Sequence, residues 1–237
     1  MCSALAPAAR AQGAPPPRPL EVSGAVNLNT KGISLVPALT LGRPSAIADV
    51  VIRKGAASFE PQFRFATDGK PWSFLLWGRY RAVATGRFRL TLGGHPAFSF
   101  RTTTVPTAAA TRDLIEVRRY LAGEASPTYA LTSTVAVGAY YLYSRGFDGA
   151  SKHTNLVAAR LNVSNIEMFR GLVAQVQPQL YFLRTSGQNG SYLSASASFT
   201  KTGAPVSITT IVNQPLRTRV VGGQDFLWNV GVTYAFR

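Results

Sequence analysis

The fold class is indicated by residues 225–237, which read Asp225-Phe-Leu-Trp-Asn-Val-Gly-Val-Thr-Tyr-Ala-Phe-Arg237. Apolar or aromatic side chains fill every even position from Phe226 to Phe236, whereas the odd positions from Asn229 to Ala235 carry small or polar ones. Successive side chains of a β-strand point to opposite faces, so a repeat of two gives a strand one apolar face. We therefore predict an amphipathic strand at this end of the sequence.

The same repeat of two runs through the chain from Leu20 onward. In one segment Phe63 and Phe65 alternate with Gln62 and Arg64, and no window of useful length shows the 3.6-residue repeat of a helix. The sequence therefore predicts an all-β chain. The expected strand segments are residues 20–29, 33–42, 47–53, 57–67, 71–83, 86–101, 111–129, 133–146, 154–164, 169–185, 190–201, 204–214 and 223–236.

The length of these segments indicates which kind of β protein this is. Several exceed the roughly five or six residues usual in soluble domains and reach the ~9–11 that a tilted strand needs to cross a bilayer. Tight turns alternate with longer connections, which is typical of outer-membrane barrels. We predict a single closed antiparallel transmembrane β-barrel of about 12 strands (roughly 10–14) between Ile33 and Phe236. Segment 20–29 then lies outside this count of twelve strands, and we expect a periplasmic arm, a lumen-threading strand or an edge strand there.

Residues 1–19 differ from the rest of the chain. They are rich in Ala and Pro and show no repeat. Ala9-Arg10-Ala11 fits the small-x-small pattern of a signal-peptidase site, although no apolar core precedes it. We expect a disordered leader that is the remnant of an export signal, followed by the barrel at residues 20–237. A leader with no targeting role is the alternative.

The charge balance is unusual for a soluble domain. Lys and Arg number 25 against 10 Asp and Glu, a net charge of +15, yet only 15% of residues are charged. Soluble domains carry about 25%, whereas a barrel in lipid confines charge to its lumen and rims. Because the arginines are spaced two apart along strands, we expect no nucleic-acid partner. One Cys and two His exclude a disulfide scaffold and a Cys/His zinc site, and we expect no metal and no cofactor.

Charged and amide side chains follow the polar face of many segments. Arg79, Arg81 and Arg89 share one face of neighbouring strands, and in a lumen they would form a positive wall of the kind that favours anions. The expected lumen-lining residues are Glu60, Arg64, Arg79, Arg81, Arg87, Arg89, Arg101, Glu116, Arg118, Arg160, Gln175, Gln177 and Gln179.

Carboxylates allow a second interpretation of the same wall. Asp49, Glu60, Glu116 and Glu124 lie mostly on separate strands among arginines. Pairs between arginine and carboxylate would bridge strands and neutralise the wall. The alternative prediction is therefore a packed structural barrel without transport.

Tyr and Trp residues gather near the ends of the predicted strands. Their rings are apolar with one polar end, which is typical of the two membrane interfaces of a barrel. A core cluster in a soluble ligand-binding β-barrel is the alternative. The expected membrane-interface aromatics are Trp72, Tyr80, Tyr141, Tyr143, Trp228, Tyr234 and Phe236.

The two histidines, His95 and His153, are the candidates for catalysis. An outer-membrane lipid hydrolase would need a Ser hydroxyl within hydrogen-bond reach of one of them. Ser99 follows His95 by four residues and would stand roughly 13 Å away along a strand, so only a serine on a neighbouring strand could serve. No nucleophile-elbow motif is present. We expect no catalytic residues, with the hydrolase as an alternative.

The final strand resembles the targeting strand of bacterial outer-membrane proteins, although Arg237 lies one residue beyond the usual final aromatic. Other segments resemble uncharacterised β-barrel proteins of Bacteroidota-type bacteria. They are Gly32–Pro44, Ser58–Phe65, Gly69–Arg81, Arg119–Glu124 and Tyr140–Arg145. The resemblance implies the outer membrane of a Gram-negative bacterium, with the lipid bilayer and the outer-membrane assembly machinery as partners. With the arginine wall, it predicts a small pore or solute-binding barrel with an anion-leaning lumen for small anionic solutes.

Overall fold

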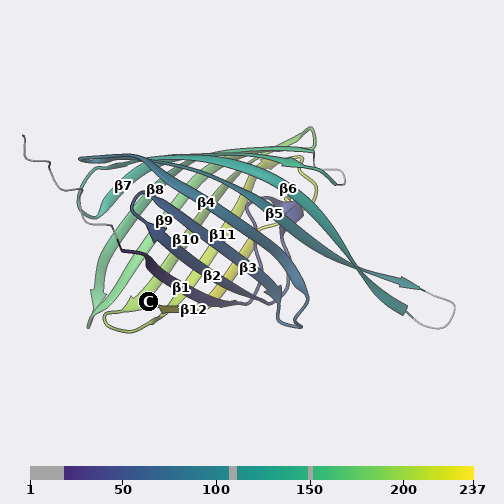
Figure 1. The fold of residues 1–237 in the computed structure, drawn as a ribbon, viewed down its shortest axis with the longest axis horizontal. Helices are drawn as coiled ribbons and strands as arrows, with labels where there is room; N and C mark the ends of the chain where they lie inside the picture. Colours follow the sequence, from purple (N-terminus) through teal and green to yellow (C-terminus); the bar gives the residue numbers. More distant parts are fainter. Residues whose placement is uncertain (1–18, 107–110, 149–151) are drawn as a thin grey trace, which may run out of the picture.

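Twelve antiparallel strands form a closed barrel in the computed structural model, which describes residues 19–106, 111–148 and 152–237 (Figure 1). The prediction of an all-β barrel of about 12 strands is confirmed. The predicted leader at residues 1–19 lies outside the described residues except for Pro19. The elements are β1 (Glu21–Asn29), η1 (Pro37–Leu39), β2 (Ser45–Lys54), β3 (Ala57–Ala66), β4 (Pro71–Thr85), β5 (Phe88–Pro106), β6 (Thr111–Ala130), β7 (Val135–Gly146), β8 (His153–Phe169), β9 (Leu172–Thr185), β10 (Gln188–Lys201), β11 (Val206–Thr218) and β12 (Leu227–Phe236).

β1 closes the barrel. It pairs with β2 on one side, where Glu21 lies opposite Arg53, and with β12 on the other, where Gly24 lies opposite Phe236. A Cβ atom at Gly24 would come within 2.5 Å of the Phe236 ring, so this position needs glycine. The segment that is surplus in the sequence prediction, residues 20–29, is therefore one of the twelve strands.

The predicted strand at residues 33–42 is wrong. These residues lie in the connection between β1 and β2, here called the plug segment (residues 30–44), which contains η1. Pro37 has no amide hydrogen to donate to a neighbouring strand, and Gly42 has φ +75°, where the chain turns. The apolar residues that alternate here pack inside the barrel instead of facing lipid.

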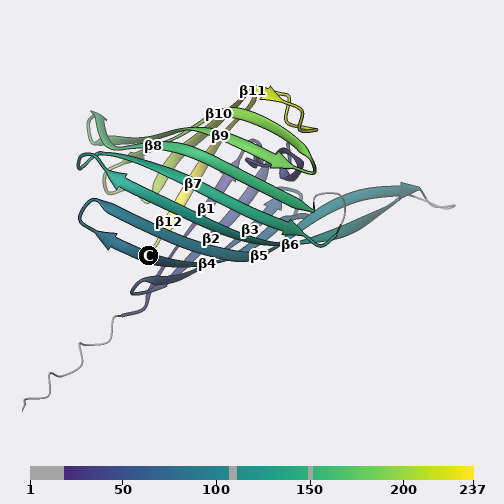
Figure 2. The ribbon, with the colours of Figure 1, turned by 90° about the horizontal axis from the view of Figure 1, so that it is seen from above.

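The two ends of the barrel differ. At the termini end, where β1 begins and β12 finishes, tight turns such as residues 55–56 and 170–171 join the strands. The opposite loop end carries the plug segment and the β11–β12 connection at residues 219–226. The β5–β6 hairpin also projects beyond the barrel at this end (Figures 1 and 2).

This hairpin is longer than its predicted strands. The β5–β6 ladder continues until Pro106 lies opposite Thr111, so the expected end of the strand at residue 101 is wrong. Residues 102–105 are Thr-Thr-Thr-Val, and β-branched side chains favour extended backbone. Strand pairing therefore extends past the level at which the other strands end.

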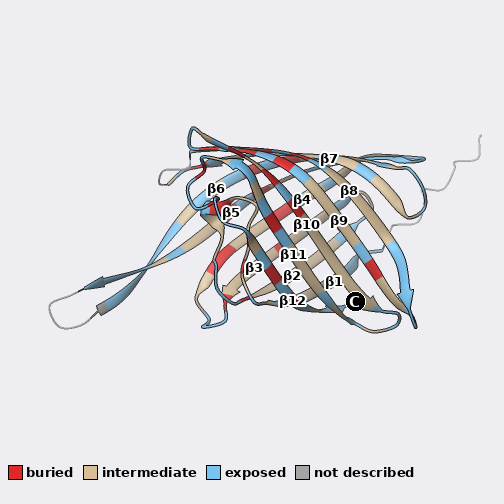
Figure 3. Ribbon diagram, turned by 180° about the vertical axis from the view of Figure 1, so that it is seen from behind, coloured by how far each residue is buried: buried red, intermediate tan, exposed pale blue. Residues whose placement is uncertain are grey.

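Apolar side chains cover the outside of the barrel. Leu28 and Val232 face each other on β1 and β12 and are 57% and 50% exposed, whereas Asn229, on the other face of β12, is 6% exposed. An apolar outer face with a polar inner face is the inverse of the arrangement in a soluble barrel, and it is the arrangement of a barrel embedded in lipid. Buried residues gather in the half nearest the loop end (Figure 3). No helix within the described ranges is long and apolar enough to span a membrane.

Candidate functional site

The lumen holds most of the predicted polar residues, at three levels between the two ends. Because the inward faces of neighbouring strands are in register, side chains far apart in the sequence meet there. The middle level contains Glu60, Arg64, Arg79, Arg160 and Gln179. Arg81, Arg89, Gln175 and Gln177 lie nearer the termini end, Arg87 lies in the β4–β5 turn, and Arg101, Glu116 and Arg118 lie at the loop end.

Arg79 is the centre of the middle level. Its guanidinium makes ion pairs with Glu60 and with Glu124, and the distance from Nε to Glu124 Oε1 is 2.6 Å. It also lies 4.3 Å from the centre of the Trp77 ring. The Glu124 side chain is only 4% exposed, and a carboxylate so buried needs charged or hydrogen-bonding partners. A Cβ at Gly93 would lie 2.8 Å from Glu124 Oε1, so glycine leaves room for the pair.

The network continues across the lumen from Glu124. Tyr140 donates its hydroxyl hydrogen to Glu124 Oε2 at 2.8 Å. The Arg160 guanidinium lies 3.8 Å from the centre of the Tyr140 ring and donates from Nε to Gln179 Oε1 at 3.1 Å. Two arginines and two glutamates thus form a belt from β3 to β9 whose charges cancel. The expected pairing of arginine with carboxylate occurs here.

The plug segment enters the mouth of the barrel at the loop end. Gly32 donates its backbone N–H to Arg43 O at 2.9 Å, which closes the segment on itself. Trp72 donates from Nε1 to Leu39 O at 2.8 Å and is 3% exposed. The interpretation of Trp72 as a membrane-interface aromatic is therefore wrong: its ring anchors the plug. A Cβ at Gly32 would lie 2.9 Å from that ring.

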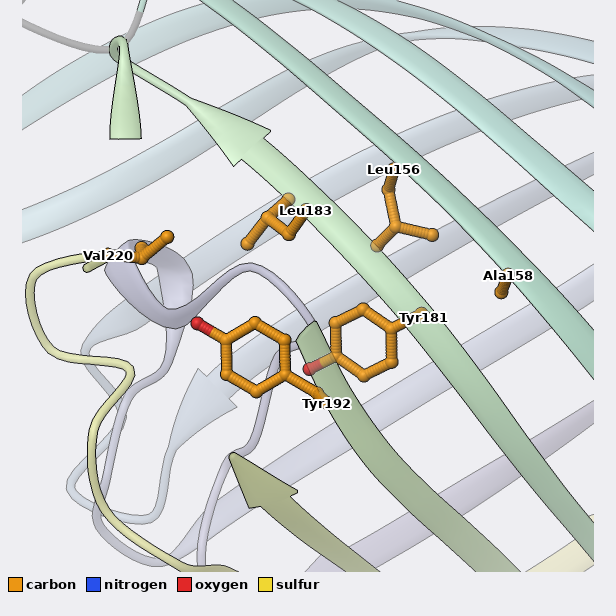
Figure 4. Close-up of a cluster of buried hydrophobic side chains, with 6 residues drawn as sticks. All are labelled: Leu156, Ala158, Tyr181, Leu183, Tyr192 and Val220. Atoms are coloured by element: carbon orange, nitrogen blue, oxygen red, sulfur yellow. The ribbon is translucent and has the colours of Figure 1, made fainter. Parts of the chain in front are cut away.

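An apolar cluster holds the plug segment against the opposite wall (Figure 4). Leu35 and Val36 pack against buried side chains of β8, β9, β10 and the β11–β12 connection. The two tyrosines of this cluster, Tyr181 and Tyr192, stack with ring centres 4.8 Å apart. The buried members are Leu156, Ala158, Tyr181, Leu183, Tyr192 and Val220. Two connections, residues 30–44 and 219–226, therefore meet inside the loop-end mouth.

A cavity of about 270 Å³, here called the plug cavity, lies between the plug segment and the wall formed by β4–β8. Trp77 and His95 stand side by side on this wall with ring centres 3.8 Å apart. His95 Nδ1 lies 3.2 Å from Pro96 O; because a carbonyl oxygen only accepts, Nδ1 carries the proton. Arg64 also lines this cavity.

The termini end of the lumen carries three arginines that have no carboxylate partner in the described residues. Arg53, Arg81 and Arg89 line a polar hollow of about 260 Å³ together with Glu60 and Arg79. Arg81 donates from Nη2 to Gly55 O at 3.0 Å. None of Arg53, Arg81 and Arg89 has a carboxylate within 4.0 Å in the described part of the chain.

Some charges at the loop end are paired, whereas Arg101 makes no ion pair within the described residues. Arg118 Nε lies 2.8 Å from Glu116 Oε1, and Lys70 Nζ lies 2.6 Å from Asp113 Oδ2.

On the outside of the same rim, Asp148 accepts from the backbone N–H, Nε and Nη2 of Arg119, each at 2.9 Å. The Arg119 side chain, followed by its backbone N–H, lowers the pKa of Asp148 to about 2. These ion pairs neutralise part of the charge at the loop end.

The other predicted interface aromatics lie on the outer face near strand ends. Tyr80, Tyr234 and Phe236 stand near the termini end, since their strand partners include Ala57, Val206 and Gly24. Tyr141, Tyr143 and Trp228 stand toward the loop end. All six are more than a third exposed.

Among the described residues, neither histidine makes a hydrogen bond to a serine side chain. His153 Nδ1 lies 2.8 Å from the Tyr143 hydroxyl, on the outer face. No hydrogen bond joins His95 or His153 to a serine hydroxyl among the described residues. Within the same ranges no group of three or more His, Cys, Asp and Glu side chains could hold a metal ion.

These features define a class of protein: a twelve-stranded outer-membrane β-barrel with an apolar exterior and a polar, partly plugged lumen. No protein-family model matches the sequence, and no curated protein matches it.

Among solved structures, the KdgM porin in complex with disordered oligogalacturonate is similar over 91% of this chain and 99% of that chain, with 10% identity and a TM-score of 0.57. The NanC porin is similar over 89% and 98%, with 10% identity and a TM-score of 0.50. At these identities the similarity is one of fold, and it is to small porins.

Proposed function

We propose that this protein is a small outer-membrane pore of a Gram-negative bacterium that passes or binds small anionic solutes. The observation that carries the proposal is the termini-end set of Arg53, Arg81 and Arg89, which face the lumen without a carboxylate within 4.0 Å in the described ranges. The central belt supports it by contrast, because its two arginines are balanced by two glutamates.

The physical reason is the field of unpaired charge in a narrow opening. Guanidinium groups lining a low-dielectric wall raise the local concentration of anions and lower that of cations. The plug segment narrows the loop-end mouth, so the same set would also hold an anion that enters from the termini end. In this proposal the barrel has no catalytic residue and needs no cofactor.

Two further elements of the proposal concern location and assembly. β12 carries the alternating outward face that the assembly machinery of the outer membrane would recognise, and it is a closing strand of the barrel. The resemblance of several segments to Bacteroidota-type barrel proteins remains a prediction about the source of the chain.

Ion selectivity in planar lipid bilayers tests the proposal. The reversal potential of the wild-type barrel in a salt gradient should have the sign of an anion-preferring channel. The triple variant Arg53→Gln, Arg81→Gln, Arg89→Gln should lose most of that preference while folding normally, because none of the three arginines makes an ion pair within the described residues.

Lys54→Gln is the matched control. Lys54 follows Arg53 on β2 at the same end of the barrel but occupies the opposite face of the strand. This variant removes one positive charge from outside the lumen, so selectivity should not change, whereas Arg53→Gln alone removes one charge from inside the lumen and should weaken the anion preference. A wild-type barrel without conductance, or one that prefers cations, would overturn the proposal.

A further inference from the structure

The plug cavity differs chemically from the rest of the lumen. Its walls are mainly apolar, with contributions from both the barrel and the plug segment. The apolar side chains that line it include Leu35, Leu39, Leu75, Ala97, Leu142 and Leu156. An apolar cavity with a few polar groups is the usual form of a site for a small organic ligand.

Arg64 is the one charged residue among the described residues that line this cavity. Its Nε donates to Gln62 Oε1 at 2.6 Å, and its guanidinium lies 5.1 Å from the centre of the Trp72 ring. No carboxylate lies within 4.0 Å; Asp49 is reached only through Gln62, which donates to it. A guanidinium has five N–H donors, and within the described chain the Nη groups of Arg64 have no hydrogen-bond partner.

The other polar groups of the cavity are the His95 ring and several hydroxyl groups. When the His95 ring is neutral with its proton on Nδ1, Nε2 is an acceptor. Hydroxyl groups come from Ser34, Ser73, Ser99, Tyr120, Tyr140, Ser144 and Thr154. A ligand in this cavity therefore meets one guanidinium, several hydroxyl groups and His95 on a mainly apolar wall.

We infer that the plug cavity binds an amphipathic monocarboxylate, an acid with one carboxylate and an apolar or aromatic body. The carboxylate lies on the Nη groups of Arg64, where a planar fork of donors matches its two oxygens. The body packs against Trp77 and the leucines of the wall and the plug segment. This inference deepens the proposed function and rests on it, since the ligand enters through the lumen.

The cavity disfavours two other kinds of anion. A polyhydroxylated sugar acid would place some of its hydroxyl groups against the leucines of a mainly apolar wall, where they lack hydrogen-bond partners, which is costly. A dicarboxylate would leave its second charge opposite no cation, because Arg64 is the single charged lining residue in the described ranges. One charge and an apolar body are the combination that the cavity accommodates.

Calorimetric titration of the folded barrel in detergent micelles tests this inference, with 3-phenylpropanoate as the probe and uncharged 3-phenylpropanamide as its matched analogue. The wild type should bind 3-phenylpropanoate more tightly than 3-phenylpropanamide. Arg64→Gln should weaken carboxylate binding about 10- to 100-fold, the range for a hydrogen-bonded charge, and leave the amide unaffected. Arg118→Gln is the control, because Arg118 faces the lumen outside the plug cavity.

Ala97→Leu gives an independent variant that leaves Arg64 in place. Ala97 is 6% exposed and lines the cavity, so a larger side chain there should reduce the binding of both probes. Equal affinity for the two probes, or unchanged carboxylate binding in Arg64→Gln, would overturn the inference. Arg64→Gln should keep the anion preference set by the termini-end arginines, so a failure here is distinguishable from a failure of the proposed pore.

Discussion

Removing the Glu124 carboxylate should destabilise the barrel by about 3 kcal/mol. Glu124 is 4% exposed at its side chain and accepts hydrogen bonds from Arg79 at 2.6 Å and Tyr140 at 2.8 Å. Each hydrogen bond to a charged group contributes about 1.5–3 kcal/mol. In Glu124→Ala, Arg79 keeps its second partner, Glu60. The loss of unfolding free energy should therefore lie near the lower end of the summed contribution of the two hydrogen bonds.

Glu116→Ala is the matched control for this prediction. Glu116 also pairs with an arginine, Arg118 at 2.8 Å, but its side chain is 49% exposed at the loop end. Exposed pairs contribute about 1 kcal/mol or less because water screens them. The two variants therefore remove the same group from a buried and an exposed ion pair.

Urea unfolding of the barrel reconstituted in phospholipid vesicles, followed by tryptophan fluorescence, measures both losses. A double-mutant cycle with Arg79→Ala then isolates the coupling between Arg79 and Glu124. If Glu124→Ala costs no more than Glu116→Ala, or if the cycle shows no coupling, then the central belt does not stabilise the barrel and the reasoning fails.

Three further predictions concern the plug, the histidine and the rim. Trp72→Ala removes the hydrogen bond to Leu39 O and should loosen the plug segment, so single-channel conductance should rise; unchanged conductance would contradict an anchoring role. Phospholipid hydrolysis should be absent from wild type and from His95→Ala alike, whereas activity that His95→Ala abolishes would establish a hydrolase. Arg119 holds the pKa of Asp148 at about 2, below its usual 3.8, so this pair stabilises the fold above about pH 4 and loses its effect as pH falls through 2. Asp148→Asn should remove that part of the pH dependence in urea titrations, and an unaltered profile would contradict it.

The repeat of two was enough to predict the architecture, because polar and apolar faces alternate on almost every strand. It could not separate a lipid-facing strand from a segment that packs inside the barrel. Residues 33–42 alternate as β1 does, yet Pro37 and the turn at Gly42 place them in the lumen. What distinguishes them is the closure of β1 on β12, and that long-range pairing has no local signal.

The polar residues of the lumen were also predictable only in part. Alternation indicated which arginines share a face, since it depends only on the strand period. It could not show that Arg79 lies between two glutamates, whereas Arg53 and Arg81 have no carboxylate partner in the described ranges. Those differences depend on register between strands. Trp72 looks like an interface aromatic in sequence, but a register shift between Arg64 and Phe65 turns it inward toward Leu39.

The reversal potential of the wild-type barrel in a planar bilayer under a salt gradient directly tests whether the lumen prefers anions. The unpaired termini-end arginines predict a potential with the sign of anion preference, which should decline as rising ionic strength screens them. A potential with the sign of cation preference would contradict the account.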